Sequence, residues 1–552
     1  MKPEIREIPF RSLPGLSRLY LEYLDLSPDA LRFYPQPPTA AGILKLAREH
    51  PPRLAFARAE MQPILERQNA ALGAGDRTFA NIRDLKADDC VAVVTGQQAG
   101  LFTGPLYTVY KALCALRIVE FLRAENVKAV PVFWIECEDH DLAEVTHGSV
   151  VAPDGTVRRL DYRERLYGGM RESARPVGTL TLSDAIREVT AEYAGFLQDG
   201  SKKEEVRSLL EKAYRPGALF ADAFGTLMAG LFRESGLVFF NPGDLAAKRI
   251  AAPVFQEALG KTDEIHRRLS ERSRDLESAG YHRQVSMQEN STVLFLLEED
   301  ERRALIRNGP RFGLKGVDRT WTSEELLELA ARCPERFSPS VLLRPLVQDH
   351  LFPTVAYVGG PSEVAYFAQI EVLYRLLNRT MPVIFPRASF TLLEPEVRAA
   401  MAESGVHFED CLQGRQTVIE KVMASGTGAK IKSLEETLER TLSEIRPELV
   451  LAEASLGPAL DTALRKMQHN LAALHSRLIQ TEARQNGTVS RSADLILNHC
   501  FPNKNLQERE LGAPFFLARH GRQLLDAVYS QVQLESFAHR LVALEAPSGN
   551  PV

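Results

Sequence analysis

The sequence predicts an α/β fold built on a doubly wound, mainly parallel sheet. Five short apolar runs are continuous rather than alternating, which is typical of strands that helices cover on both faces. Helical sequence follows two of these runs directly, so strands and helices alternate as they do in β-α-β units. The five expected strands are 91–94, 130–135, 237–240, 354–358 and 382–385.

The first β-α-β unit occupies residues 91–135. Between its two strands, apolar residues recur at helical spacing over 106–116, and Pro105 suits the first turn of a helix. The fourth strand repeats this pattern, because a Gly-Gly-Pro turn at 359–361 precedes a helical stretch at 362–377. Two units of this kind favour a doubly wound open sheet.

Gaps of insert size separate the strands and predict accessory lobes. Charged helical sequence occurs in both gaps, at 202–214 in the first and at 262–278 in the second. The second gap also contains a hairpin pattern around 293–307. The gaps cover about 151–236 and about 245–339.

After Pro395 the sequence predicts a helical arm. Apolar residues there alternate steps of four and three residues, which is a heptad pattern. We expect Pro447 and the pair Gly457-Pro458 to turn the chain, giving an antiparallel helical hairpin. A lone hairpin leaves an apolar edge exposed, so we expect a second copy of the chain to cover it across a two-fold axis. The alternative is that the seam only pairs the two helices of one chain. The later helix carries Leu460, Leu464, Met467, Leu471, Leu474 and Leu478, and the earlier one carries Ile431, Leu434, Leu438, Leu442 and Ile445.

These patterns divide the chain into core segments, inserts and an arm. We expect a first part of the core at 1–165, a connective insert at 166–236, a core strand segment at 237–250, a second insert at 251–338, a second part of the core at 339–395, a helical coiled-coil dimerisation arm at 396–500 and a C-terminal segment returning to the core at 501–552.

Composition excludes several classes of function. The chain has 67 Lys and Arg against 72 Asp and Glu, so its net charge of −5 gives no electrostatic reason to expect a nucleic-acid or anionic-membrane partner. We find no signal-peptide pattern and no stretch of roughly 20 apolar residues, and therefore expect a cytoplasmic protein without membrane contact. Six scattered cysteines without a C-x-x-C pair predict reduced thiols rather than disulfides or a zinc knuckle.

A glycine-rich loop follows the first strand and precedes the first helix. Its three glycines stand at four-residue intervals, and backbone N–H groups at such a helix start favour a phosphate or carboxylate. The loop matches neither a Walker A motif nor the dinucleotide fingerprint, and the alternative is a purely structural turn. Because open α/β sheets bind ligands at the carboxyl ends of their strands, the candidate binding residues are Thr95, Gly96, Gln97, Gln98 and Gly104.

An acidic turn follows the second strand, where Glu136, Glu138, Asp139 and Asp141 surround His140. Four carboxylates at one strand end repel one another unless a cation, a bound amine or shifted protonation compensates them. We expect His140 to act as a general base, and Asp139 or Asp141 to orient it or to hold a substrate ammonium. Glu138 is a further candidate binding residue, and magnesium suits such oxygens better than zinc does. The alternative is a solvated acidic loop.

Residues around the fourth strand are expected at the same sheet edge. Arg344 precedes that strand and is suited to clamp a carboxylate or phosphate, unless it merely pairs with an acidic neighbour. Gly359 and Gly360 leave the strand and complete the candidate binding set.

Taken together, these segments resemble the bacillithiol biosynthesis cysteine-adding enzyme family. The segments VTGQQAGLFTGPLYTVYK, PVFWIECEDHDLAEVTH, RPLVQDHLFPTVAYVGGPSEVAYF, MPVIFPR and FPNKNLQER occur in the order found in that family. The resemblance spans essentially the whole chain. It implies a Rossmann-like core similar to nucleotidyltransferases and class I aminoacyl-tRNA synthetases, with two connective inserts and a dimerising coiled coil. The His-x-Gly-His and Lys-Met-Ser-Lys-Ser signatures of those synthetases are absent from the sequence.

The resemblance also implies a reaction. Cysteine would be joined to the amine of glucosaminyl-malate to give bacillithiol, in a ligase reaction with ATP-linked activation of the cysteine carboxylate as an acyl-adenylate or acyl-phosphate. Under this hypothesis the malate carboxylates lie at the glycine loop and Arg344, and His140 faces the sugar amine. The alternatives are another nucleotide-dependent transferase or hydrolase acting on a small anionic substrate, and a non-catalytic coiled-coil scaffold.

Overall fold

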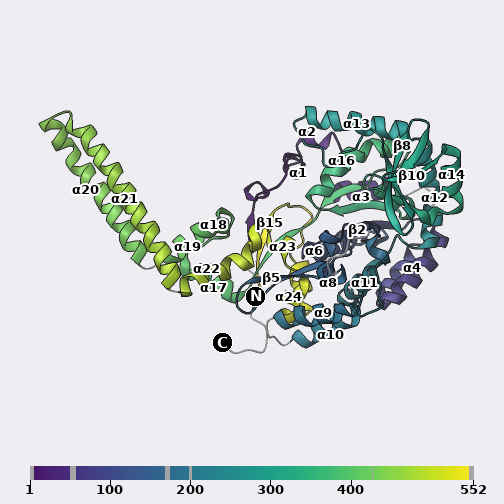
Figure 1. The fold of residues 1–552 in the computed structure, drawn as a ribbon, viewed down its shortest axis with the longest axis horizontal. Helices are drawn as coiled ribbons and strands as arrows, with labels where there is room; N and C mark the ends of the chain where they lie inside the picture. Colours follow the sequence, from purple (N-terminus) through teal and green to yellow (C-terminus); the bar gives the residue numbers. More distant parts are fainter. Residues whose placement is uncertain are drawn as a thin grey trace.

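A computed structural model describes residues 5–49, 57–167, 174–197, 202–424, 427–485 and 487–545. The chain forms a large α/β body from which two long helices project as an arm (Figure 1). The described helices include none that is both long and apolar enough to cross a lipid bilayer.

The body is centred on a five-stranded parallel sheet with the strand order β13-β12-β2-β3-β6. Every neighbouring pair is parallel, so the predicted sheet is confirmed. The strands coincide with the five apolar runs, although β2 and β3 extend further at their carboxyl ends. Their bounds are β2 Val91–Gln98, β3 Ala129–Glu136, β6 Val238–Phe240, β12 Thr354–Gly359 and β13 Val383–Pro386.

Helices cover both faces of this sheet. Alternate residues of a strand point to opposite faces, and Val94 and Trp134 belong to one apolar cluster whereas Val93 and Phe133 belong to the other. Helix α6 (Tyr107–Ala124) links β2 to β3, and α16 (Pro361–Leu376) links β12 to β13. The N-terminal part contributes α1 Arg18–Leu24, α2 Pro28–Leu31, α3 Ala40–Glu49, α4 Arg58–Leu72 and α5 Asp76–Asp84.

The first insert, between β3 and β6, is mainly helical. After the short α7 (Leu142–Val145) the chain forms a two-stranded antiparallel hairpin and then a group of helices. The charged stretch predicted to be helical is α10 (Lys203–Ala213). The remaining elements are β4 His147–Val151, β5 Val157–Asp161, α8 Tyr162–Tyr167, α9 Ala185–Phe196 and α11 Phe220–Leu231.

The second insert, between β6 and β12, contains a five-stranded antiparallel sheet in the order β10-β9-β8-β7-β11. The predicted hairpin is confirmed as β7 (Ser291–Glu298) and β8 (Glu301–Asn308), and the predicted helix as α13 (Thr262–Ser278). The other elements are α12 Leu245–Gly260, β9 Arg311–Leu314, β10 Val317–Trp321, α14 Ser323–Arg332, β11 Phe337–Pro339 and α15 Arg344–Leu351.

A second, three-stranded sheet joins the two ends of the chain. Strand β15 (His539–Ala543) pairs antiparallel with β1 (Ile5–Ile8) and parallel with β14 (Ser389–Leu393). The free edge of β14 is bonded by side chains, because Gln507 accepts a hydrogen bond from the Leu392 N–H and donates one to the Leu392 carbonyl. Three helices precede β15 in the chain, namely α23 Gln507–Glu510, α24 Ala513–His520 and α25 Gln523–Tyr529.

The arm is an antiparallel hairpin of α20 (Thr427–Ala452) and α21 (Leu456–Gln485), which confirms the predicted helical pair (Figure 1). The predicted turn is wrong in its position, because Pro447 lies inside α20 and Pro458 lies in the first turn of α21. The chain reverses at 453–455. Pro447 is exposed, so water can bond the carbonyl that it leaves unpaired, and the Arg446–Asp461 ion pair holds α20 against α21 beside it.

Four helices form the base of the arm: α17 Pro395–Ser404, α18 Phe408–Gln413, α19 Arg415–Ala424 and α22 Gly487–Cys500. Of the predicted seam residues, the side chains of Ile431 and Leu478 lie outside the described residues.

Candidate active site

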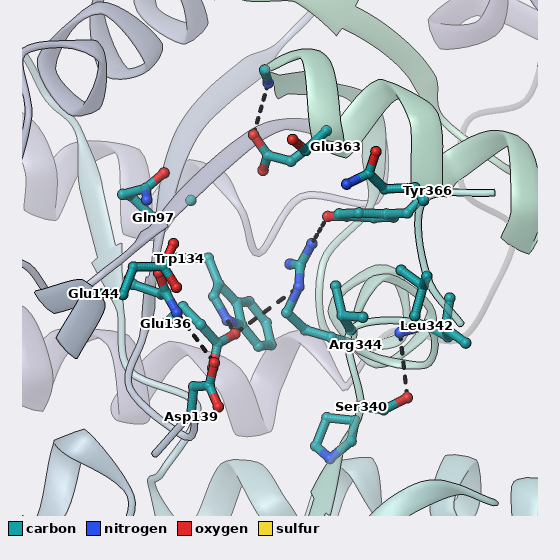
Figure 2. Close-up of a pocket in the computed structure, with 18 of the residues that line it drawn as sticks. Gln97, Trp134, Glu136, Asp139, Glu144, Ser340, Leu342, Arg344, Glu363 and Tyr366 are labelled. Carbon is teal, nitrogen blue, oxygen red and sulfur yellow. Dashed lines mark hydrogen bonds and ion pairs between the residues drawn. The ribbon is translucent and has the colours of Figure 1, made fainter. Parts of the chain in front are cut away.

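A cavity of about 670 Å³ lies at the carboxyl ends of β2, β3 and β12. Residues of β7 and β8 from the second insert complete its wall. The cavity brings together two segments that the sequence analysis expected to meet, since Gln97 and Gln98 leave β2 whereas Asp139 and His140 follow β3. Figure 2 shows Gln97 and Asp139 in this cavity. Gly96, Arg344 and Gly360 also line it.

The second half of the glycine loop is not part of the cavity. Residues 99–104 turn into the interior, where the Phe102 ring packs against Tyr193 and the Phe102 N–H donates a 2.9 Å hydrogen bond to the hydroxyl of Tyr214. Phe102 and Thr103 both have positive φ angles, of 53° and 80°. The predicted anion cradle is therefore wrong for Gly104, and only its first part, at residues 96–98, faces the cavity.

Four other predicted residues lie outside the cavity lining. Thr95 is buried and donates to the Val358 carbonyl at 3.0 Å, and Glu138 is buried in an ion pair with Lys248. Asp141 is exposed at the start of α7. At Gly359 a Cβ atom would lie 3.0 Å from the Glu363 Cβ, so that glycine allows close packing. Thr95, Glu138 and Gly359 thus contribute to the packing around the cavity without lining it.

A buried lysine organises the loop after β2. Lys111 of α6 donates to the Gly96 carbonyl at 2.9 Å and to the side-chain oxygen of Gln97 at 3.0 Å, and it forms an ion pair with Glu363. Burial lowers the pKa of Lys111, although Glu363 opposes this shift. Burial would raise the pKa of Glu363, but the charge of Lys111 and the hydrogen bonds from Lys111, the Gly360 N–H and Tyr357 together outweigh it, and the pKa lies below the ordinary value. Because its oxygen is occupied, Gln97 presents its NH₂ group, which donates to Tyr107 at 3.3 Å.

Glu136 ends β3 inside the cavity. Trp134 Nε1 donates to its Oε2 at 3.1 Å, and the Glu138 N–H donates to its Oε1 at 3.1 Å. The nearest arginine nitrogen, Arg344 Nε, lies 4.0 Å from Oε2. Burial, and then the charge of Glu138, raise the pKa of Glu136. Figure 2 shows Glu136, Trp134 and Arg344 side by side.

Arg344 is largely occupied by protein groups. Its Nη2 donates to the hydroxyl of Tyr366 at 2.7 Å and to that of Tyr357 at 3.3 Å, and its Nη1 donates to Gln348 at 3.1 Å. A guanidinium has five N–H donors, and these three hydrogen bonds use three of them. The predicted bidentate clamp is therefore restricted, although Arg344 still contributes a fixed positive charge to the cavity.

Arg302 of β8 compensates the acidic turn. Its Nη1 donates to Asp139 Oδ1 at 3.2 Å and lies 3.4 Å from His140 Nδ1, while the guanidinium stacks 3.6 Å from the centre of the Phe295 ring. Asp139 also accepts a 3.1 Å hydrogen bond from Gln98 Nε2, and its Oδ1 lies 3.4 Å from His140 Nδ1. Of the two predicted orienting residues, Asp139 is thus the one that lies against His140.

Sequence reasoning missed several residues of this cavity. Arg302 stands 162 residues after His140 in an insert, so no local pattern could have placed it there. Lys111 did carry a signal, because it is a charged residue within an otherwise apolar helical stretch. Arg387 and Arg509 also line the cavity, and burial raises the pKa of the nearby Glu144 carboxyl.

A parallel, doubly wound sheet with a charged cavity at the carboxyl ends of its strands is the arrangement of a Rossmann-like protein. Comparison with known proteins specifies the family. The family model described as bacillithiol biosynthesis BshC, N-terminal Rossmann-like domain, matches residues 4–388, and that for the C-terminal coiled-coil domain matches residues 390–544. The chain therefore belongs to the BshC family of bacillithiol biosynthesis.

Curated relatives agree with this assignment. Proteins named "Putative cysteine ligase BshC" include one from Koribacter versatilis, 37% identical over 94% of this chain and 96% of its own length. Another from Salinibacter ruber is 34% identical over 86% and 87%, and one from Symbiobacterium thermophilum is 35% identical over 88% and 90%. A solved structure described as a putative arginyl-tRNA synthetase from Campylobacter jejuni covers 79% of this chain and is itself covered over 99%, at 10% identity and a TM-score of 0.24, which is too low to bear on the fold.

Proposed function

We propose that this chain is a cysteine ligase of bacillithiol biosynthesis, which joins the carboxyl group of cysteine to the amine of glucosaminyl-malate in an ATP-linked reaction. The observation that carries the proposal is one cavity, at the carboxyl edge of the sheet, that contains carboxylates and fixed cations together. Family membership supports the same conclusion.

The chemistry of the cavity matches the substrates. Glucosaminyl-malate carries two carboxylates and an amine, and cysteine carries an amine and a carboxylate. The carboxylates of Glu136, Asp139 and Glu144 suit ammonium groups, whereas Arg509 suits carboxylate or phosphate groups. Arg387 adds a positive charge to the cavity wall but is paired with the buried Glu508. A volume of about 670 Å³ lies within the range of small-molecule sites.

The reaction needs an activated acyl group, because an amide does not form readily from a free carboxylate. ATP would supply this activation as an acyl-adenylate or acyl-phosphate. The side-chain NH₂ of Gln97, held by Lys111, is one donor available to an anionic group, and the start of α16 at Gly360 and Pro361 lies at the same cavity. His140, oriented by Asp139, and Glu136 are the two groups that we consider as acceptors of the amine proton. Magnesium, a homodimer and a cytoplasmic location stay predictions.

Incubation of the purified chain with glucosaminyl-malate, cysteine and ATP tests this function. We expect bacillithiol, detected by mass spectrometry after thiol alkylation, together with AMP or ADP, and no product when any one substrate is omitted. A chain that releases AMP or ADP only with a different acceptor would be another nucleotide-dependent enzyme. A scaffold would show no thermal stabilisation by glucosaminyl-malate, cysteine or ATP. Either result would overturn the proposal.

A further inference from the structure

We propose that Glu136 receives the ammonium group of the amine substrate and takes its proton when the amide bond forms. This inference rests on the proposed ligase function and names a catalytic residue for it. Glu136 thus takes the role of general base that the sequence led us to expect for His140.

The position of Glu136 is rigid. It is the last residue of a central strand and pairs in parallel register with Gln98. Trp134 lies two residues earlier on the same face and donates to one carboxylate oxygen, and the Glu138 N–H donates to the other. Each oxygen of an ionised carboxylate can accept about two hydrogen bonds. The two oxygens are therefore fixed by one bond each and keep acceptor capacity, and the side chain, 20% exposed, lines the cavity.

Glu136 also differs from its acidic neighbours in how its charge is compensated. Glu138 forms a tight ion pair with Lys248, and Asp139 receives a hydrogen bond from Arg302. Among the described residues, the arginine nitrogen nearest to Glu136 is Arg344 Nε at 4.0 Å, with Arg302 acting from further away, and the Nη atoms of the Arg344 guanidinium bond to two tyrosines and a glutamine. A cation from the substrate would complete the compensation of Glu136, and a primary ammonium is a cation that also donates hydrogen bonds. The raised pKa of Glu136 agrees with this reading, because a carboxylate in such surroundings is a better proton acceptor.

His140 is less well placed for the same role. Its side chain is 39% exposed, in the loop after β3 rather than on the strand. Its Nδ1 faces Arg302 and Asp139, so only Nε2 remains to act on a substrate. We therefore assign His140 to substrate contact.

The substrate ammonium gives one proton to the Glu136 carboxylate, and the freed nitrogen lone pair attacks the carbonyl carbon of the activated cysteine. The C–N bond forms, and the C–O bond to the phosphate breaks with its electron pair leaving on AMP or inorganic phosphate. The second nitrogen proton passes to the leaving phosphate or to water. The co-reactant is a nucleoside triphosphate, which the proposed function already requires.

Glu136→Gln tests the assignment, since it removes the charge and nearly preserves the shape. We expect kcat/KM for bacillithiol formation to fall about 100-fold or more, with His140→Ala falling less. Calorimetry should show that the wild-type chain binds glucosaminyl-malate about tenfold or more tightly than its N-acetylated form, as expected for a charge-assisted bond, and that Glu136→Gln loses this preference. Glu136→Asp should recover part of the kcat/KM and part of the preference for the free amine. Glu328→Gln, an exposed carboxylate on α14, is the matched control and should leave both unchanged.

Three outcomes would overturn the inference. In the first, the Glu136→Gln variant keeps its turnover. In the second, the variant still binds glucosaminyl-malate more tightly than the N-acetylated form. The third is a variant whose KM rises for cysteine alone, which would mean that Glu136 binds the cysteine ammonium. Equal thermal melting temperatures for all variants show that folding is not the cause. Failure of the ligase function itself would look different, because the wild-type chain would then form no bacillithiol.

Discussion

Lys111 and Glu363 form an ion pair in the wall of the cavity. Lys111 is buried, and its bonds to the Gly96 carbonyl and Gln97 fix the loop that leaves β2. Glu363 is further held by the hydroxyl of Tyr357 at 2.6 Å and by the Gly360 N–H at 2.7 Å. The pair therefore links the carboxyl ends of β2 and β12.

We expect Lys111→Met to lower the free energy of unfolding by about 3–5 kcal/mol, because it leaves Glu363 as a buried charge without its cation. The double variant Lys111→Met with Glu363→Gln should recover much of this loss, since it removes the uncompensated charge. Urea unfolding followed by circular dichroism measures both values. Equal stability of Lys111→Met and the wild-type chain would show that the pair contributes nothing.

Gln98 should act mainly on substrate affinity. Its Nε2 donates to Asp139, so it links the loop after β2 to the acidic turn. Gln98→Ala removes the hydrogen bond to Asp139, and we expect the Kd for glucosaminyl-malate to rise about three- to tenfold, from a bond of about 1 kcal/mol, with a smaller effect on kcat. Titration calorimetry and steady-state kinetics separate the two. An unaltered affinity would assign Gln98 a structural role only.

At the scale of elements, the sequence predicts those helices and strands whose residues show a local hydrophobic pattern. The strands 91–94 and 354–358 were identifiable because both faces of each are buried, which makes their sequence continuously apolar. Strand β14 could not be identified from the sequence, since its existence depends on β15 about 150 residues later and on the side chain of Gln507. The turn of the arm was misplaced because Pro447 is tolerated on an exposed helical face. Tertiary context, rather than local propensity, decides these cases.

Substitution of Glu508 tests how much the packing of α23 against β14 contributes to the free energy of unfolding. It accepts hydrogen bonds from Arg387 at 2.6 Å, from Ser389 at 2.9 Å and from the Phe390 N–H at 3.0 Å, and is almost fully buried. We expect Glu508→Gln to lower the free energy of unfolding by about 3 kcal/mol or more at pH 7, because Arg387 then stays buried without its partner.

The stabilisation by Glu508 should depend on pH. Burial alone would raise the pKa of this carboxyl, but the charge and hydrogen bond of Arg387, together with His539 and the Phe390 N–H, outweigh burial, and the pKa in the folded chain lies below the ordinary value. A lowered pKa means that the contribution is complete above the unfolded-state pKa, at about 4.3, and is lost as the pH falls through the folded-state pKa. The difference between wild type and Glu508→Gln should therefore shrink in acid. A difference that stays constant from pH 7 to pH 3 would contradict this account.

At the scale of the whole molecule, the cavity is assembled from parts far apart in the chain. The sequence could predict that Gln97, Gln98, Asp139 and His140 share a sheet edge, because parallel strands end at the same edge. It could not predict Arg302 or Arg509, since an insert and the C-terminal segment bring them in. It also could not show that residues 99–104 turn away from the cavity, because this depends on packing against the first insert.

The arm gives the last expectation at this scale. Two contacts across the hairpin, Arg446 with Asp461 and Glu439 with Gln468, set the pairing of α20 with α21. Continued along both helices, this pairing places Leu434 beside Leu474, and the two residues are 51% and 55% exposed. The hairpin thus leaves an apolar patch that its own two helices do not cover, and we propose that a second copy of the chain covers it.

We expect the wild-type chain to be a dimer in analytical ultracentrifugation at micromolar concentration, and the double variant Leu434→Glu with Leu474→Glu to be a monomer. Two charges at a desolvated contact cannot both find partners there, so association is lost while the helices remain, because glutamate favours helix. Thr441→Glu places a charge on an exposed position of the same arm and should stay dimeric. A wild-type chain that sediments as a monomer, or a double variant that remains a dimer, would show that the arm serves another purpose. Because the arm projects away from the body, we expect the monomeric variant to keep its cavity and to bind glucosaminyl-malate with unchanged affinity.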